Sequence, residues 1–341
     1  MLDVATTRGV LAATLFAGLS TVLVGGAVVA WRHRHDFYPQ PRRRLVSWDL
    51  SDILICFVIV HLVPSLVFQI LKVSGFFHWQ YGATPSLEDR ILLARCMNWA
   101  SCLGLPFALV AVLSWLAMRG TQPWQIGLST WRLGRSVAAA GVTGWMLVPA
   151  VFLIHQAAVW FDILVLKTDP AKQDKHPLLE LMTGQLGSVE WLLVVFVAVI
   201  KAPLEEELIF RGLLLPWLAE RWWSAPIVWS VSLLVAAWLG PGLAPVIFSG
   251  VAGLPLLLVC IRKDILPSPF LAVFGSSLLF AVAHSNVWPT PIPLFLLGCG
   301  LGYLMQRTRS LFAPITLHAL FNSVTTIAIL TGLADQLQKR F

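Results

Sequence analysis

Charged residues are scarce in this sequence, and their scarcity excludes a soluble protein. Only 12% of the 341 residues are Asp, Glu, Lys or Arg, and 57% are hydrophobic, whereas soluble domains carry roughly 25% charged residues. Because a segment within lipid must satisfy its own backbone hydrogen bonds, long apolar runs such as 9–31 and 189–200 predict transmembrane helices. The expected fold class is an all-α, polytopic transmembrane helical bundle with about 8–10 spans.

Cysteine is also rare, and no two cysteines form a CxxC pair. The five cysteines lie inside apolar stretches, at Cys56, Cys96, Cys102, Cys260 and Cys299. Isolated cysteines in apolar surroundings behave as small hydrophobic side chains. We therefore expect free, buried thiols.

The basic residues that give the chain a net charge of +7 form no single patch, which argues against nucleic-acid binding. They lie in short loops such as 32–44, 119–135 and 262–263, and these loops share one side if the N-terminus is outside. The sixteen tryptophans, Trp48 and Trp217 among them, fall near the edges of apolar runs and are interpreted as an aromatic belt.

We expect spans near 9–31, 50–74, 92–118, 137–163, 189–217, 225–239, 243–261, 266–285, 291–306 and 310–333. No internal repeat is visible. Segment 225–261 contains Pro241, Pro245 and Pro255 beside several glycines. A re-entrant or broken element in this segment is therefore the alternative to two full spans.

Three carboxylates and an arginine follow Pro203 inside one predicted span. Glu207 and Arg211 are four residues apart, which favours an ion pair on one helix face. Glu206 points about 100° away from Glu207 and is a candidate base in a low dielectric. Glu205, another 100° or so around the helix, is expected to tolerate the loss of its charge. The alternative is that Pro203 ends the span and leaves the acids in interfacial water.

Two histidines occupy later predicted spans, in Phe280-x-x-x-His284 and in His318-x-x-x-Asn322. Residues four apart share a helix face, so His318 and Asn322 should point toward one neighbouring helix. A single histidine in a membrane helix more often makes a packing hydrogen bond than a catalytic contact.

Three strings in this order resemble the motifs of the CPBP family: Glu206-Glu207-x-x-x-Arg211-Gly212, Phe280-x-x-x-His284 and His318-x-x-x-Asn322. That family comprises the CAAX prenyl endopeptidases of the Rce1 type and bacterial relatives, often labelled abortive-infection or bacteriocin-processing proteins. The resemblance covers roughly 189–325. It implies a catalytic core over 189–333, with an apolar insertion near 225–261. Residues 1–188 match no motif of the family, and their apolar runs predict N-terminal transmembrane helices with loops.

The resemblance implies an intramembrane endopeptidase that cleaves a peptide bond in a membrane-associated or prenylated, CAAX-like substrate. The roles it implies are water activation by Glu206 and His284, oxyanion stabilisation by His318 and Asn322, and structural support by Glu207 and Arg211. The alternatives are a non-catalytic scaffold or bacteriocin-immunity-type protein of the same fold, and a transporter. A transporter is disfavoured because the sequence has no repeat.

The sequence leaves two alternatives for the predicted chemistry, one with a bound metal ion and one without. Glu206, His284 and His318 would make a His₂Glu set like that of catalytic zinc sites, yet HExxH is absent. We favour a metal-free glutamate and histidine pair, with a divalent metal such as zinc as the alternative. The absence of GxSG and GxGD strings argues against rhomboid-like and presenilin-like mechanisms.

The expected location is a bacterial inner membrane, with the active site toward the cytosol. The expected partners are the lipid bilayer and a peptide or membrane-protein substrate, and nucleic acid is not among them.

Overall fold

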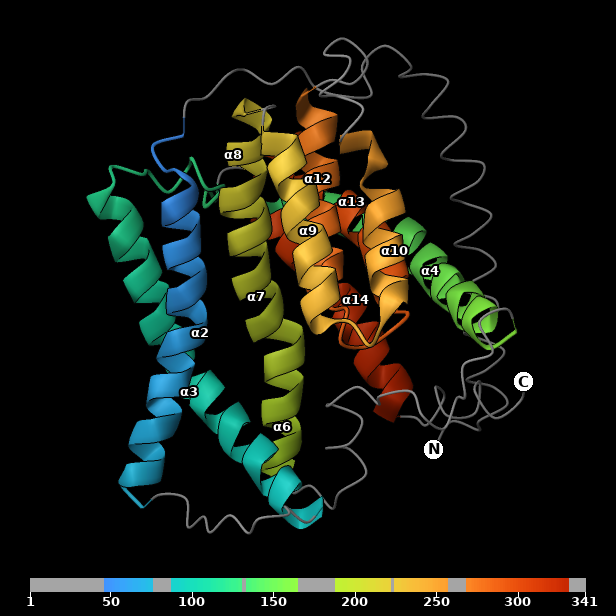
Figure 1. Ribbon diagram of the computed structural model, residues 1–341. Helices are drawn as coiled ribbons and strands as arrows, with labels where there is room; N and C mark the ends of the chain where they lie inside the picture. Colours follow the sequence, from blue (N-terminus) through green and yellow to red (C-terminus); the bar gives the residue numbers. More distant parts are fainter. Residues whose placement is uncertain are drawn as a thin grey trace. The chain divides into compact units, whose positions relative to one another are not determined.

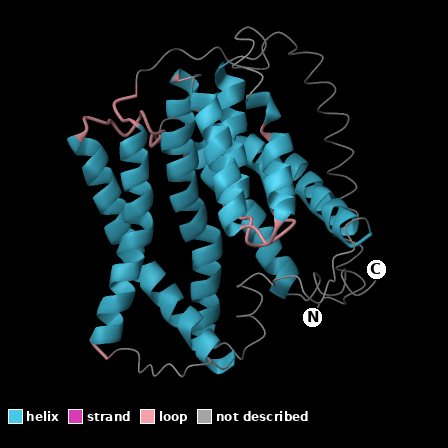
Figure 2. Ribbon diagram, in the orientation of Figure 1, coloured by secondary structure: helices cyan, strands magenta, loops and turns pink. Residues whose placement is uncertain are grey.

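The structure, a computed structural model, describes residues 46–75, 87–130, 133–164, 188–221, 224–256 and 268–330. In these ranges the regular structure is helical and no strand occurs (Figures 1 and 2). The all-α class is therefore confirmed. The predicted span 9–31 and Cys260 lie outside the described residues. The other four cysteines form no disulfide, as expected. Cys56 and Cys96 are buried, whereas Cys102 and Cys299 are only half-buried, so the expected burial holds for two of the four.

In chain order the helices are α2 (Leu50–Val73), α3 (Leu87–Met118), α4 (Leu133–Leu164), α6 (Ser188–Phe196), η2 (Val197–Lys201), α7 (Ala202–Glu207), η3 (Leu208–Leu214), α8 (Leu215–Glu220), α9 (Ala225–Leu239), α10 (Leu243–Ala252), α12 (Ser268–Val282), α13 (Pro291–Thr308) and α14 (Phe312–Leu330), where η2 and η3 are π-helices.

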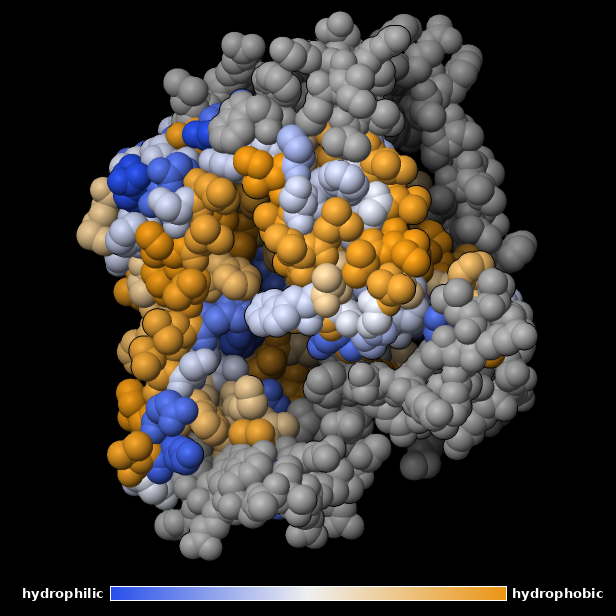
Figure 3. All heavy atoms as spheres, in the orientation of Figure 1, coloured by the Kyte–Doolittle hydropathy of each residue, from blue (hydrophilic) through white to orange (hydrophobic). Residues whose placement is uncertain are grey.

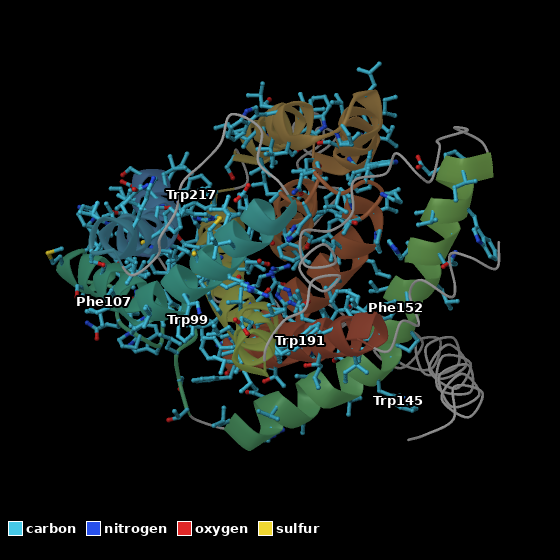
Figure 4. The ribbon with its side chains drawn as sticks, turned by 90° about the horizontal axis from the view of Figure 1, so that it is seen from below. Trp99, Phe107, Trp145, Phe152, Trp191 and Trp217 are labelled. Carbon is cyan, nitrogen blue, oxygen red and sulfur yellow. The ribbon has the colours of Figure 1, made fainter. Side chains whose placement is uncertain are left out.

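Four of the described helical stretches are long and apolar enough to cross a membrane: Leu50–Val73, Leu92–Met118, Leu133–Ile163 and Phe312–Ile329. Apolar side chains cover much of the described surface in Figure 3. Large aromatic residues are among them: Phe107 on α3 is 66% exposed and Trp145 on α4 is 50% exposed (Figure 4). Such a surface suits lipid rather than water, so the chain is an integral membrane protein.

The described helices form two compact units. The first unit contains α4, α8, α9, α10, α12, α13 and the start of α14. In it α12 packs against α8, α9, α10 and α13, and α13 also packs against α4. Gly300 permits the last contact, because a Cβ atom there would lie 2.2 Å from Leu147 Cδ2. Small residues of this kind let membrane helices approach closely.

The second unit contains α2, α3, the helical run from α6 to Leu213, and α14 from His318 onward. In it α3 packs against α2, α6 and η2. The buried carboxylate of Asp52 joins α2 to α3, since it accepts hydrogen bonds from Trp115 Nε1 at 3.0 Å and Arg119 Nε at 3.2 Å. Asp49 caps the N-terminus of α2 in a capping box with Asp52.

The apolar segment after α8 is shorter than two membrane spans require. α9 has 15 residues and α10 has 10, and they pack together as a hairpin around 240–242. At about 1.5 Å per residue neither helix crosses a hydrocarbon core of roughly 30 Å. For the described part of 225–261, the short hairpin fits the broken-element alternative better than two full spans.

Residues 188–220 form one continuous helical run, from α6 to α8, that contains both π-helices (Figure 1). η2 ends two residues before Pro203, and η3 ends two residues before Pro216. In an α-helix a proline ring clashes with the carbonyl four residues earlier, and a wider π turn gives that carbonyl room. The prolines therefore explain why the helix widens at these two places. Pro203 does not end the helix.

Candidate active site

Glu207 lies at the centre of a buried polar cluster in the second unit. Its Oε1 accepts a hydrogen bond from Arg211 Nη1 at 2.9 Å and another from His318 Nδ1 at 2.8 Å. The Glu207 and Arg211 side chains are both 0% exposed. The ion pair predicted from their spacing therefore forms, and it is fully desolvated. Losing one partner would leave a buried charge uncompensated.

His318 is oriented by this cluster. A carboxylate oxygen can only accept, so the bond to Glu207 places a proton on Nδ1 of His318. Nε2, the other ring nitrogen, then faces Glu206, whose Oε2 lies 3.8 Å away. Glu207 thus fixes the ring so that its second nitrogen is directed at the neighbouring carboxylate.

Glu206 is the most accessible of the three consecutive glutamates. Its side chain is 28% exposed, while Glu205 and Glu207 are buried. Its Oε2 atom is nevertheless buried and has no hydrogen-bond partner among the described residues. This oxygen is a hydrogen-bond acceptor. A water in the gap can donate to it and can accept from Nε2 of His318 when that nitrogen carries a proton.

Asn322 shares a face of α14 with His318, and its side chain reaches the same helical run. Nδ2 of Asn322 donates to the backbone carbonyl of Ala198, in η2, at 2.8 Å. The two residues therefore point to one neighbour, as their spacing predicts. Their partners differ, however, because His318 contacts a side chain and Asn322 contacts the backbone nine residues before it.

Glu205 was expected to tolerate the loss of its charge, but the structure places it in a buried ion pair. Its side chain is 8% exposed and forms an ion pair with Lys201, whose side chain is 12% exposed. Sequence reasoning missed this pair, although Lys201-x-x-x-Glu205 has the same i, i+4 spacing as Glu207 and Arg211. Glu205 therefore holds a buried charge, and its neutralisation would strand that of Lys201.

His284 lies in the first unit, directly after α12. Its Nδ1 is 2.9 Å from the carbonyl oxygen of Phe280, one helical turn earlier. Since a carbonyl only accepts, Nδ1 carries a proton, and in the neutral form of the ring Nε2 has the lone pair. The turn after His284 is held at Trp288, whose Nε1 donates to the buried carboxylate of Asp162 on α4 at 2.8 Å.

Residues outside the predicted motifs hold the other two motif helices as well. Trp48, which precedes α2, donates from Nε1 to the carbonyl of Leu213 in η3 at 3.1 Å. At the start of α14, the amide of Leu311 donates to the carbonyl of Gly127 at 2.9 Å. Trp48 is 1% exposed and Trp217 is 3% exposed. The interpretation of these two tryptophans as belt residues was therefore wrong.

Gly127 illustrates how closely its loop approaches α14. Its φ is +82°, and a Cβ atom there would lie 2.8 Å from the amide nitrogen of Leu311. Only glycine combines a positive φ with so close a backbone contact. The loop at 127 is therefore matched in detail to the first turn of the helix that carries His318.

The candidate metal ligands do not gather into a metal site within the described residues. Among the described residues, no group of three or more His, Cys, Asp or Glu side chains is placed to hold a metal ion. In the second unit Glu206 and His318 together supply two donors, whereas catalytic zinc sites commonly use three protein ligands. Zinc stays a prediction, and it would need His284 as the third ligand.

These features define a polytopic helical membrane protein with a buried cluster of glutamate, arginine and histidine inside its helices. Residues 188–271 and 262–324 match the family described as type II CAAX prenyl endopeptidase Rce1-like. The C-terminal region of the chain is therefore similar to the Rce1-like family, which confirms the resemblance predicted from the three motifs. No curated protein and no solved structure is significantly similar to the chain.

Proposed function

We propose that this protein is an intramembrane endopeptidase that hydrolyses a peptide bond of a membrane-associated substrate. The Rce1-like match over the motif helices supports a protease of the CAAX type. The proposal rests on the position of two atoms. Glu206 Oε2 has no hydrogen-bond partner among the described residues, and His318 Nε2 lies 3.8 Å from it. Two atoms at this separation can both contact one water at about 2.8 Å.

In the proposed reaction Glu206 takes a proton from this water while the water oxygen bonds to the substrate carbonyl carbon. The negative charge that develops on the carbonyl oxygen is stabilised by His318, which in its protonated form donates from Nε2. The proton then passes to the amide nitrogen as the C–N bond breaks. Glu207, which is paired with Arg211, holds the His318 ring. Water is the only co-reactant that amide hydrolysis requires.

The family resemblance adds His284 to the groups that activate the water, and its Nε2 lone pair has the required tautomer. We predict that His284 Nε2, the Glu206 carboxylate and the His318 ring surround one cavity. An experimental structure can test this by direct measurement. A separation of more than about 10 Å between His284 and Glu206 would remove His284 from the reaction, because hydrogen-bond reach is near 3 Å.

Glu206→Gln is the decisive variant for the proposal. Glutamine keeps the size and a hydrogen-bonding oxygen but cannot accept the proton, so we expect cleavage to fall on the order of 10²–10⁴-fold without unfolding. Cleavage is measured on a farnesylated CAAX peptide and on an unprenylated transmembrane peptide, beside melting in detergent. Glu190→Gln, on the same helical run but outside the cluster, is the matched control.

The same experiment distinguishes the proposed enzyme from the alternative, a non-catalytic scaffold or immunity-type protein. If Glu206→Gln cleaves as fast as the parent, the site lies elsewhere. If the parent cleaves neither peptide while remaining folded, the scaffold function is the better description.

We propose a peptide or small membrane protein as the substrate, an active site facing the cytosol, and a bacterial inner membrane as the location, from the basic loops and the family resemblance.

A further inference from the structure

The carbonyl of Ala198 is a backbone acceptor that the helix itself leaves without its regular donor. In η2 the hydrogen bonds run from residue i+5 to residue i, and the amide of Ala202 donates to the carbonyl of Val197. The next bond in this register would join residue 203 to Ala198. Residue 203 is proline, which has no N–H.

Asn322 supplies the missing donor from another helix. Its Nδ2 lies 2.8 Å from the Ala198 oxygen. An amide nitrogen carries two hydrogens, and this bond commits one of them to the backbone. Pro203 lies two residues before the first glutamate of α7 and is itself buried. The bond therefore joins α14 to the helical run at the entrance of the segment that carries Glu206.

We propose that Asn322 is a positioning residue, which replaces the N–H that Pro203 lacks and so holds α7 and its Glu206 carboxylate against α14. His318 makes the second contact of the same face of α14, to Glu207. The helical run is thus held before α7, through the backbone carbonyl of Ala198, and at the last residue of α7, through the side chain of Glu207. This inference rests on the proposed function, but it concerns a hydrogen bond that exists with or without substrate.

A rescue experiment separates this role from direct donation to the oxyanion. Asn322→Ala removes the donor, and Pro203→Ala restores a backbone N–H where η2 would use it. Four proteins are compared: the parent, Asn322→Ala, Pro203→Ala and the double variant. Cleavage of the two peptides, melting in detergent and deuterium exchange of the amides in 196–205 are measured for each.

We expect Asn322→Ala to lower kcat on the order of 10²-fold with little change in KM, because a small displacement of a catalytic group has that effect. It should also lower Tm and speed exchange in 196–205. The double variant should regain Tm, slow exchange and a kcat within a few-fold of Pro203→Ala alone.

Other outcomes overturn the proposal. A donor to the oxyanion, whose loss costs about 10²–10³-fold in kcat, would give a double variant as inactive as Asn322→Ala, with parental melting in both. A double variant that does not fold, or an Asn322→Ala protein that melts and cleaves like the parent, counts equally against it. If the parent is inactive on both peptides the proposed function fails, and the exchange and melting data still decide the role of Asn322.

Discussion

Residues 188–324 and residues 46–164 contribute different kinds of contact to the molecule. The first range matches the Rce1-like family and contains the charged cluster of Glu206, Glu207 and Arg211 with His318. The second range lies outside the match and contributes hydrogen bonds that hold the motif helices in place. Trp48 bonds to η3, and Gly127 bonds to the start of α14.

The comparison indicates that chemistry and positioning are separable in this chain. Changes to the cluster should remove activity or leave a buried charge unpaired. Changes to the anchors should have smaller effects, shared between stability and turnover. Variants in both regions, measured in the same detergent, can break or sharpen this distinction.

The largest effect on stability is expected for Arg211→Ala. It leaves the Glu207 carboxylate buried without its cation, which commonly costs about 3–5 kcal/mol. The yield of folded protein should fall sharply, and Tm should fall in what remains. Arg307→Ala, at an exposed position on α13, is the control and should stay within about 0.5 kcal/mol of the parent. Normal folding of Arg211→Ala with loss of turnover alone would show that the arginine takes part in the reaction.

An intermediate effect is expected for Trp48→Phe. Phenylalanine retains most of the buried ring but cannot donate to the Leu213 carbonyl, and an unsatisfied buried acceptor costs about 1–3 kcal/mol. We expect a lower Tm, faster amide exchange around 208–214 and a modest loss of kcat. Trp145→Phe, on the exposed face of α4, should leave all three unchanged. If Trp48→Phe equals this control, the region outside the match does not position η3.

The smallest effect is expected for Asp49→Ala, which removes the N-cap of α2 at a cost of about 1 kcal/mol. The Ser51 hydroxyl and the Asp52 amide donate to Asp49 and hold its pKa below the ordinary value of 3.8. A lowered pKa in the folded state means that the charged form contributes stability above pH 3.8, and that this contribution disappears as pH falls through the lowered value. The difference in Tm between parent and variant should therefore be constant from neutral pH to about pH 5 and shrink in stronger acid. A difference that grows on acidification would contradict the cap.

Local patterns predicted the helices and the ion pair well. The expected span 50–74 corresponds to α2, Leu50–Val73. The expected bounds 225–239 are those of α9, Ala225–Leu239, although this helix is too short for the full span that was predicted. The pair of Glu207 and Arg211 followed from i, i+4 spacing alone. Such features depend on residues within a few turns of one another, so a single sequence contains the necessary information.

The anchors could not be predicted in this way. Trp48 and Leu213 are 165 residues apart, and a buried tryptophan near a membrane boundary has the same local pattern as one in an aromatic belt. Lys201 and Glu205 were visible by spacing but were overlooked beside the motif. The partner of Asn322 is a backbone carbonyl. Every residue has one, so the residue types do not indicate which carbonyl Asn322 contacts. Pro203 was the available signal, since a proline inside a helix implies an acceptor without a donor.

The two π-helices also set how evolution can vary this protein. Each π turn contains one residue more than the same length of α-helix, and successive residues in an α-helix are about 100° apart. Deleting or inserting one residue in 197–214 would therefore rotate the glutamates relative to the helix on one side of them. Loops absorb such length changes, but this segment cannot. Among homologues, alignment gaps should thus be absent from 197–214 even where the residue types differ.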